Sequence, residues 1–119
     1  MPNDSFTREQ CTARRHALRT LNDQLRTSLD GCQVVITHAV AHHAPDFALR
    51  ATACVQAHVD FPDGDDPHGE HDFGAFDLDG HRMFWKIDHY DKNMVYSAED
   101  PTDRANTVSV LTIMFASDY

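Results

Sequence analysis

Residues 61–91 read FPDGDDPHGEHDFGAFDLDGHRMFWKIDHYD, and this stretch decides the fold that we expect for the chain. A loop rich in Asp, Gly and Pro at 61–72 leads into an apolar run at 73–78, and Asp79-Gly80 separates that run from a second one at 82–90. An Asp-Gly pair between two such runs is the strongest short-range indication of a β-hairpin. The stretch therefore predicts two antiparallel strands that follow an acidic loop.

The second of these strands carries aromatic residues on both of its faces. Successive side chains of a strand point to opposite faces. One face carries Met83, Trp85, Ile87 and His89, and the other carries Phe84, Lys86, Asp88 and Tyr90. We expect one face to pack on helices and the other to be partly covered. Trp85, or the side with Phe84 and Tyr90, is therefore a candidate contact surface.

A first helix is predicted near the N-terminus. Thr7 and Gln10 have the spacing of a capping box, and Asp30-Gly31 is a typical helix end because Gly adopts the left-handed conformation readily. The arginines lie outside the apolar stripe of this helix. The stripe contains Cys11, Leu18, Leu21, Leu25 and Leu29.

A strand and a second helix follow. Residues 33–37 are largely β-branched and predict a buried strand, and residues 38–44 form a connector. Pro45-Asp46 begins an amphipathic helix that ends near Val59. Its inward positions are Phe47, Ala51, Cys54, Val55 and His58.

The C-terminal part of the chain leaves two structures open. Residues 94–97 predict a third antiparallel strand. The β-branched content of residues 105–119 favours a strand, whereas their length and their acidic, Pro-containing start favour a helix, which we prefer. The expected fold class is α+β: two amphipathic helices packed on a small, mostly antiparallel sheet, with a C-terminal helix or strand. Residues 1–119 form a single domain, with 1–6 flexible.

Length and composition predict a cytoplasmic protein. The 119 residues suffice for one hydrophobic core, and no apolar run approaches the roughly eighteen residues that cross a bilayer. The start, MPNDSFTREQ, lacks the basic and apolar regions of a signal peptide. Cys11, Cys32 and Cys54 form no CxxC pattern, so we expect reduced thiols. We expect no cofactor and no membrane association.

Negative charge is concentrated in one part of the sequence. The formal net charge is −9 at pH 7, whereas the first thirty residues are slightly basic. Such a field repels nucleic acid and attracts basic protein surfaces. Direct nucleic-acid binding is therefore not expected. The carboxylates between residues 60 and 103 are Asp60, Asp63, Asp65, Asp66, Glu70, Asp72, Asp77, Asp79, Asp88, Asp91, Glu99, Asp100 and Asp103.

Several ungapped motifs resemble a known family. They are GEHDFGAF at 69–76, WKID at 85–88 with the following Tyr90-Asp91, and VLTIM at 110–114 with ASDY at 116–119. Together they resemble small bacterial proteins classed as a domain of unknown function, with the pattern DPYGEHDFGAF…FFWKIDYYD…RVLTIM…EY. This chain has His68 and His89 where the pattern more often has Tyr. The resemblance implies a cytosolic bacterial protein, often carried on mobile elements, and supplies no activity or catalytic residue.

The acidic loop also contains residues that are able to bind a metal. His68, Glu70, His71 and Asp72 lie within five residues, and Asp88 and Asp91 could add oxygen ligands. However, the spacing fits no established zinc pattern such as HExxH. A structural interpretation is also open, in which the loop carboxylates accept hydrogen bonds from backbone N–H groups. In that interpretation His71 and Asp72 brace the loop and Glu70 remains for contact.

Other catalytic arrangements have little support. No cysteine or serine lies in a glycine-rich elbow, and the chain has neither a GxxxxGK[ST] nor a GxGxxG phosphate-binding motif. We predict no catalytic residue, although a general acid and base formed by His71 with Glu70 or Asp88 stays open.

Two functional hypotheses follow. The first is an acidic binding or inhibitor protein that docks on a basic, nucleic-acid-processing host protein, as an antirestriction or anti-CRISPR factor would, with carboxylates imitating phosphates. Its binding residues are Asp63, Asp65, Asp66, Glu70, Asp88, Asp91, Trp85 and Tyr90. The alternative is a small metal-dependent hydrolase centred on the GEHD loop. Its metal ligands are His68, Glu70, His71 and Asp88.

Overall fold

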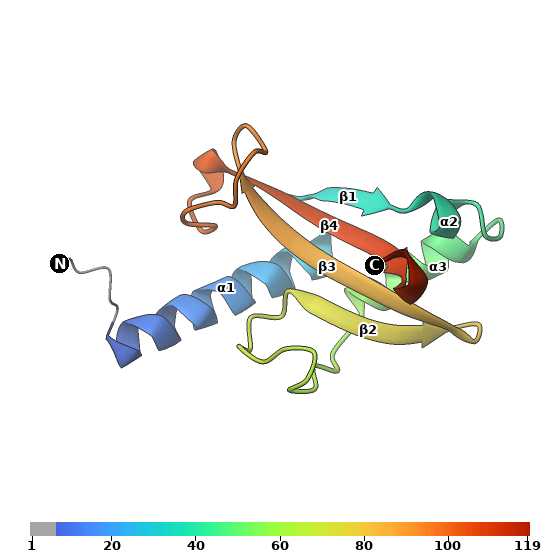
Figure 1. The fold of residues 1–119 in the computed structure, drawn as a ribbon, viewed down its shortest axis with the longest axis horizontal. Helices are drawn as coiled ribbons and strands as arrows, with labels where there is room; N and C mark the ends of the chain where they lie inside the picture. Colours follow the sequence, from blue (N-terminus) through green and yellow to red (C-terminus); the bar gives the residue numbers. More distant parts are fainter. Residues whose placement is uncertain (1–6) are drawn as a thin grey trace.

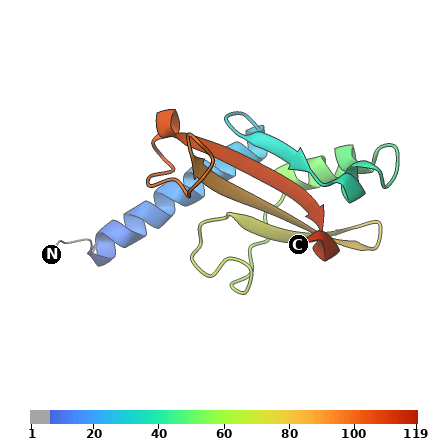
Figure 2. The same cartoon turned by 45° about the horizontal axis from the view of Figure 1, so that its top comes forward.

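A four-stranded mixed sheet carries helices on one of its faces in the computed structural model, which describes residues 7–119 (Figures 1 and 2). The expected flexibility of residues 1–6 lies outside the described residues. In chain order the elements are α1 (Arg8–Ser28), β1 (Gln33–Ile36), α2 (His38–Ala41), α3 (Phe47–Gln56), β2 (Phe73–Leu78), β3 (His81–Asp91), η1 (Arg104–Asn106), β4 (Thr107–Phe115) and η2 (Ala116–Asp118). The predicted α+β class is confirmed.

The strands lie in the order β1-β4-β3-β2. The predicted hairpin is confirmed: β2 and β3 pair antiparallel, and Asp79 and Gly80 both have positive φ, at 53° and 82°. Two positive φ values in a two-residue turn match the right-handed twist of the flanking strands. β3 pairs antiparallel with β4, whereas β1 pairs parallel with β4, so the sheet is mostly antiparallel.

The preferred C-terminal helix is wrong, because residues 107–115 form strand β4. This strand lies between β1 and β3 and forms backbone pairs on both sides. Its β-branched residues suit a pleated, buried position, and this preference outweighs the helix-like start. The predicted strand at 94–97 is also wrong, since in that segment only Ser97 forms a bridge, to Tyr90.

Helix α1 begins at the predicted capping box, in which Thr7 and Gln10 bond each other's backbone N–H groups. Its end comes earlier than predicted: Leu29, not Gly31, is the left-handed cap, with φ 60°. Arg26 was expected on the outside but is buried. Its Nη1 donates to the carbonyl oxygens of Val55 and Gln56, which end α3 and need donors from outside that helix.

The segment between α1 and α3 differs from the prediction in burial and length. The predicted strand is present as β1, but it is a largely exposed edge strand, because the sheet ends there. The expected connector contains the short helix α2. Helix α3 ends at Gln56 rather than near Val59, and Phe47, Ala51 and Val55 face the core as predicted, whereas Cys54 is half-buried.

Trp85 is the largest fully buried side chain, so it is a core residue and not a contact surface. It packs between the sheet and the helices with Met83, Ile87, Leu111 and Ile113 from β3 and β4 and with Leu25, Phe47, Ala51 and Val55 from α1 and α3. The rings of Phe61 and His58 meet it edge to face, at centroid distances of 6.1 and 5.5 Å. The indole lies against Gly74, its partner across β2 and β3.

The lack of a side chain at Gly74 is therefore a requirement of the core. A Cβ at this position would overlap Trp85 Nε1 and lie 2.8 Å from His58 Nε2. We expect Gly74→Ala to lower the free energy of unfolding by about 1 to 3 kcal/mol, the usual cost of overpacking. Urea denaturation measures the effect. The matched control is Gly64→Ala, where an added Cβ has no atom within 4 Å; equal stability of the two variants would contradict this packing.

Candidate functional site

A hollow of about 250 Å³ lies between α1, the loop 61–72 and the C-terminal half of β3. We call it the acidic hollow, because Glu70, Asp72 and Asp88 line it. Its other lining residues are Leu18, Asn22, Ile87, His89, Tyr90, Ser97, Ala98 and Pro101. The hollow therefore collects side chains from segments that are far apart in the sequence.

The loop 61–72 is held in place by Asp66 and His71. The buried Asp66 carboxylate accepts the backbone N–H groups of Glu70 and His71, at 3.0 and 3.2 Å. The His71 ring stacks on Phe61 with centroids 3.7 Å apart, and its Nδ1 lies 2.8 Å from Asp23 Oδ1 on α1. These contacts fit the bracing role expected for His71. They also correct the assignment of Asp66 as a binding residue, because its carboxylate is occupied by the loop itself.

Burial and like charges raise the pKa values of two carboxyl groups in the acidic hollow. The pKa of Glu70 is raised by burial and by the nearby Asp72, and the pKa of Asp72 is raised by burial and by Asp66 and Asp88. Asp72 contributes to the loop through its backbone carbonyl, which accepts the N–H of Ile87 at 2.8 Å. Both charged carboxylates are thus in a less favourable environment than in water.

A hydrogen-bonded network of neutral side chains forms the floor of the hollow. Asn22 on α1 donates to the carbonyl oxygen of Glu70 at 2.9 Å, and its Oδ1 accepts from His89 Nε2 at 2.8 Å. His89 Nδ1 accepts from the hydroxyl of Ser109 on β4 at 2.7 Å. Burial, with the charge of Arg104, lowers the pKa of His89 to about 4. The imidazole is therefore neutral at physiological pH, and both of its nitrogens are engaged.

A second hollow, of about 390 Å³, adjoins the end of β3. Its acidic lining residues are Asp91, Glu99, Asp100 and Asp103, and its other residues are Asn106 and Thr107. We call the carboxylates of the two hollows together the acidic surface. Several of these groups also stabilise local turns, as Asp100 does by accepting from the backbone and hydroxyl of Thr102.

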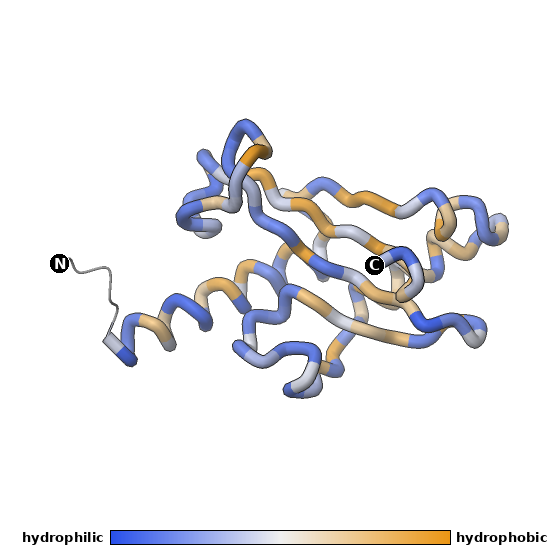
Figure 3. Tube along the Cα trace, viewed as in Figure 1, coloured by the Kyte–Doolittle hydropathy of each residue, from blue (hydrophilic) through white to orange (hydrophobic). Residues whose placement is uncertain are grey.

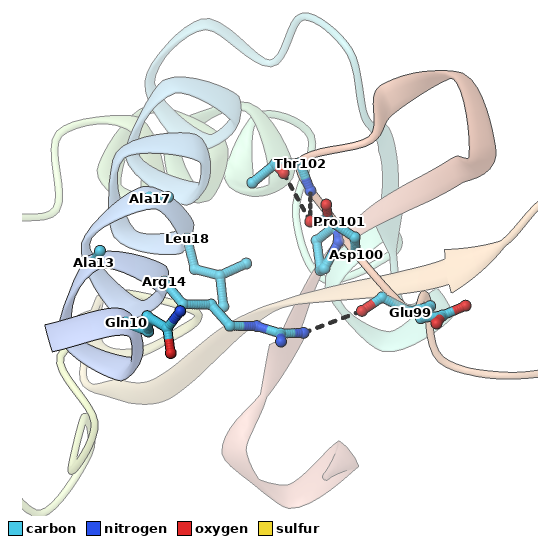
Figure 4. Close-up of a pocket in the computed structure, with 9 residues that line it drawn as sticks. All are labelled: Gln10, Ala13, Arg14, Ala17, Leu18, Glu99, Asp100, Pro101 and Thr102. Carbon is cyan, nitrogen blue, oxygen red and sulfur yellow. Dashed lines mark hydrogen bonds between the residues drawn. The ribbon is translucent and has the colours of Figure 1, made fainter. Parts of the chain in front are cut away.

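A groove of about 540 Å³ separates α1 from the segment 99–102 (Figure 4). Ala13, Ala17 and Leu18 give it an apolar wall on the helix side. Arg14 crosses the groove and donates to the carbonyl oxygen of Glu99 at 3.1 Å, which leaves the Glu99 carboxylate directed away from the guanidinium (Figure 4). The basic helix therefore borders the acidic surface.

The remaining predicted binding residues are dispersed. Asp63 is exposed and Asp65 half-buried in the loop 61–72, and neither lines either hollow. Asp88 forms an ion pair with Lys86 at 3.1 Å. Tyr90 is half-buried and lines the acidic hollow, and its role as a contact residue stays a prediction.

The four candidate metal ligands do not converge. Glu70 and Asp88 line the same hollow, but His71 is directed toward Asp23 and Asp66, and His68 is exposed. Residues 7–119 contain no group of three or more His, Cys, Asp and Glu side chains arranged to hold a metal ion. Within the same residues, no helix has the length and apolar character to span a membrane.

Sequence reasoning missed Asn22 and the network role of His89, and its list of binding residues left out Glu99, Asp100 and Asp103, although it counted them among the acidic residues. Asn22 lies one helical turn from Leu18 and from Leu25, so it is a polar residue within an apolar stripe. Its position in the stripe could have indicated a role for Asn22, because a polar residue that faces a core needs hydrogen-bond partners.

Comparison with known proteins identifies a family without an assigned function. The family model described as Protein of unknown function (DUF3768) matches residues 36–118. The match includes strands β2, β3 and β4 and every carboxylate of the acidic surface, whereas α1, with Asn22, and all of β1 but Ile36 precede it. No curated protein and no solved structure matches the chain.

The His89 network predicts a dependence of stability on pH. Since the pKa of His89 falls from 6.5 to about 4 on folding, the native state binds fewer protons than the unfolded chain between these values. Stability is therefore lost as the pH falls from about 6.5 toward about 4. Thermal melts across this range should show a weaker loss in His89→Gln than in the wild type. The exposed His42→Gln is the control, and equal pH dependence in all three proteins would contradict the network.

Two Asp→Asn substitutions should have opposite effects. Asp72 has a raised pKa, so its charge opposes folding at neutral pH, and Asp72→Asn should raise the melting temperature. This gain in melting temperature should shrink as the pH falls below the raised pKa of Asp72 toward the ordinary value of 3.8. Asp79 has a lowered pKa because Arg50 bonds to it at 2.7 and 3.0 Å, so Asp79→Asn should lower the melting temperature at neutral pH. A lower melting temperature in Asp72→Asn would show that its charge supports the fold.

Proposed function

Since the chain belongs to the family described as Protein of unknown function (DUF3768), we propose its function from the site: it is an acidic binding protein whose partner is a basic protein. The observation that carries this proposal is the crowding of carboxylates on the acidic surface. Three carboxylates line one hollow and four line the adjoining one. A cationic surface placed on them would offset the burial and the neighbouring carboxylates that raise the pKa values of Glu70 and Asp72, and would gain charge-assisted hydrogen bonds.

The basic side chains beside the acidic surface neutralise only part of its negative charge. Lys86 pairs with Asp88, and the pKa of Asp100 is lowered by hydrogen bonds from Thr102 and by the charge of Arg14. Glu70 and Asp72 keep raised pKa values although His68 is near both. Groups whose charge disfavours folding are often kept for contact with another molecule, because stability and function are traded at such sites.

The same geometry favours binding over hydrolysis. The one imidazole of the acidic hollow, His89, uses both nitrogens in bonds to Asn22 and Ser109, so it is not poised to transfer a proton to a substrate. The GEHD loop uses His71 as a brace against Phe61 and Asp23. No further observation favours the metal-dependent hydrolase.

The finer proposal is that the partner handles nucleic acid and that the carboxylates imitate backbone phosphates. A surface that binds phosphates is basic and recognises closely spaced negative charges. The net charge of −9 and the resemblance to proteins often carried on mobile elements support a factor of the antirestriction or anti-CRISPR type. In this proposal the protein acts as an inhibitor that occupies a nucleic-acid-binding surface.

Capture from host lysate at low and high salt tests this function. We expect the immobilised protein to retain a basic, nucleic-acid-binding protein at low salt, to release it at high salt, and to lose it to competing duplex DNA. The triple variant Glu70→Gln, Asp72→Asn, Glu99→Gln should capture at least about tenfold less, since each 1.4 kcal/mol of lost binding energy changes affinity tenfold.

The matched control changes the same charge elsewhere. The control triple variant carries Glu9→Gln, Asp30→Asn and Asp77→Asn. These three positions are exposed and lie outside both hollows. This triple variant should capture the partner as the wild type does. If both triple variants lose capture equally, net charge and not the position of the carboxylates determines binding, which contradicts the proposed site. Capture that resists both high salt and competing duplex DNA would contradict phosphate imitation.

A further inference from the structure

We infer that Met94, Val95 and Tyr96, which we call the tip, form the apolar anchor of this interface and insert into an apolar pocket on the basic partner. The inference rests on the proposed function and names the side chains that would supply its hydrophobic contact. The tip lies in the loop between β3 and β4, where Figure 3 shows an apolar segment among polar ones.

The tip presents three large side chains in succession to solvent. Met94 is 46%, Val95 65% and Tyr96 73% exposed. Among the other exposed large apolar side chains of the described residues, Val34 and Val35 are neighbours on strand β1 and so point to opposite faces of the sheet, and Leu49, Val59 and Tyr119 stand singly in the sequence. Single exposed apolar residues are ordinary on protein surfaces, but a contiguous apolar group with a polar rim is characteristic of interaction sites.

Hydrogen bonds hold the loop in one shape. The Asp91 carboxylate accepts the N–H groups of Asn93 and Val95, both at 3.1 Å, and the Asp91 carbonyl accepts the N–H of Met94 at 3.0 Å. The backbone of Tyr96 accepts from Asp91 N–H at 2.8 Å. The Asp91 carboxylate, predicted as a contact group, thus acts mainly to order the tip.

Met94 has a φ of 57°, a left-handed conformation that is unfavourable for a residue with a side chain. Strained residues persist where the surrounding structure fixes them, and they occur often at binding sites. The loop therefore maintains an unfavourable conformation that keeps an apolar group in water. An ordered anchor loses little conformational entropy on binding, which favours affinity.

The position of the tip within the acidic surface determines its occupant. Asp91 lines the second hollow, and Ser97 and Ala98, which follow the tip, line the acidic hollow. A rim of carboxylates repels nucleic acid, anionic lipid and a second copy of a chain with a net charge of −9. An apolar group with this rim fits a basic protein surface that contains an apolar pocket, since desolvated aromatic and aliphatic anchors dominate interface energetics.

Two synthetic peptides of equal length and charge separate the anchor from the charge. One alternates lysine clusters with leucine, and the other carries glutamine in place of each leucine. We expect the wild type to bind the Lys/Leu peptide at least about tenfold more tightly than the Lys/Gln peptide, a difference of 1.4 kcal/mol. The tip variant Met94→Asn, Val95→Ser, Tyr96→Ser should bind both peptides with the lower affinity, and Asn is chosen because it tolerates positive φ.

The control variant removes apolar surface elsewhere, through Leu49→Ser and Val59→Ser. It should keep the preference for the Lys/Leu peptide, and circular dichroism melts should show all variants folded. If the wild type binds both peptides equally, or if the tip variant keeps the preference, the anchor is contradicted while the proposed function stands. If neither peptide binds in a salt-sensitive manner, the proposed function fails. Wild-type dimerisation or binding to neutral lipid vesicles that the tip variant abolishes would also overturn the inference.

Discussion

The burial of Trp85 fixes the position of the acidic surface. Phe61 meets the indole edge to face, and the guanidinium of Arg26 lies over both rings, 5.5 Å from the Phe61 centroid and 5.4 Å from that of Trp85. His71 then stacks on Phe61, and the residues beside it enter the acidic hollow. The acidic loop is therefore held by an aromatic contact with the core, together with the backbone N–H groups of Glu70 and His71 that donate to the Asp66 carboxylate.

A buried polar network also links the acidic loop to the rest of the fold. Asn22, His89 and Ser109 join α1, β3 and β4, and Asn22 also holds the backbone of Glu70. Such a network is stabilising only while each member keeps its partners, so a change in one member displaces the others. The two sets of contacts together explain how a small domain keeps several carboxylates close to one another on its surface.

Local sequence patterns predicted the parts of the fold that depend on neighbouring residues. The Asp79-Gly80 turn, the alternation in β3 and the Thr7 capping box are local features, and each was predicted at its observed position. β4 was assigned to a helix because its central place between β1 and β3 depends on partners far away in the sequence. Likewise, the exposed position of β1 follows from its place at the sheet edge.

The sequence predicted which kinds of residue form the candidate site better than it predicted their arrangement. The acidic stretch, Glu70 and Tyr90 were identified from the sequence, whereas Trp85 and Asp66 proved to be buried. No local pattern indicates that Asn22 on α1 lies beside Glu70, since the two residues are 48 positions apart. The difference between a bracing carboxylate and a contacting one depends on which donors the fold brings to it.

Titration of the side-chain carboxyl groups of Glu70 and Asp72 by NMR, in the free protein and with the Lys/Leu peptide bound, tests the central claim most directly. The claim is that these charges are crowded in the free protein and are matched by a cationic partner. The account predicts pKa values above the ordinary 4.5 and 3.8 in the free protein, and a fall of both when the peptide binds. Ordinary or lowered values in the free protein, or values that the bound peptide leaves unchanged, would contradict it.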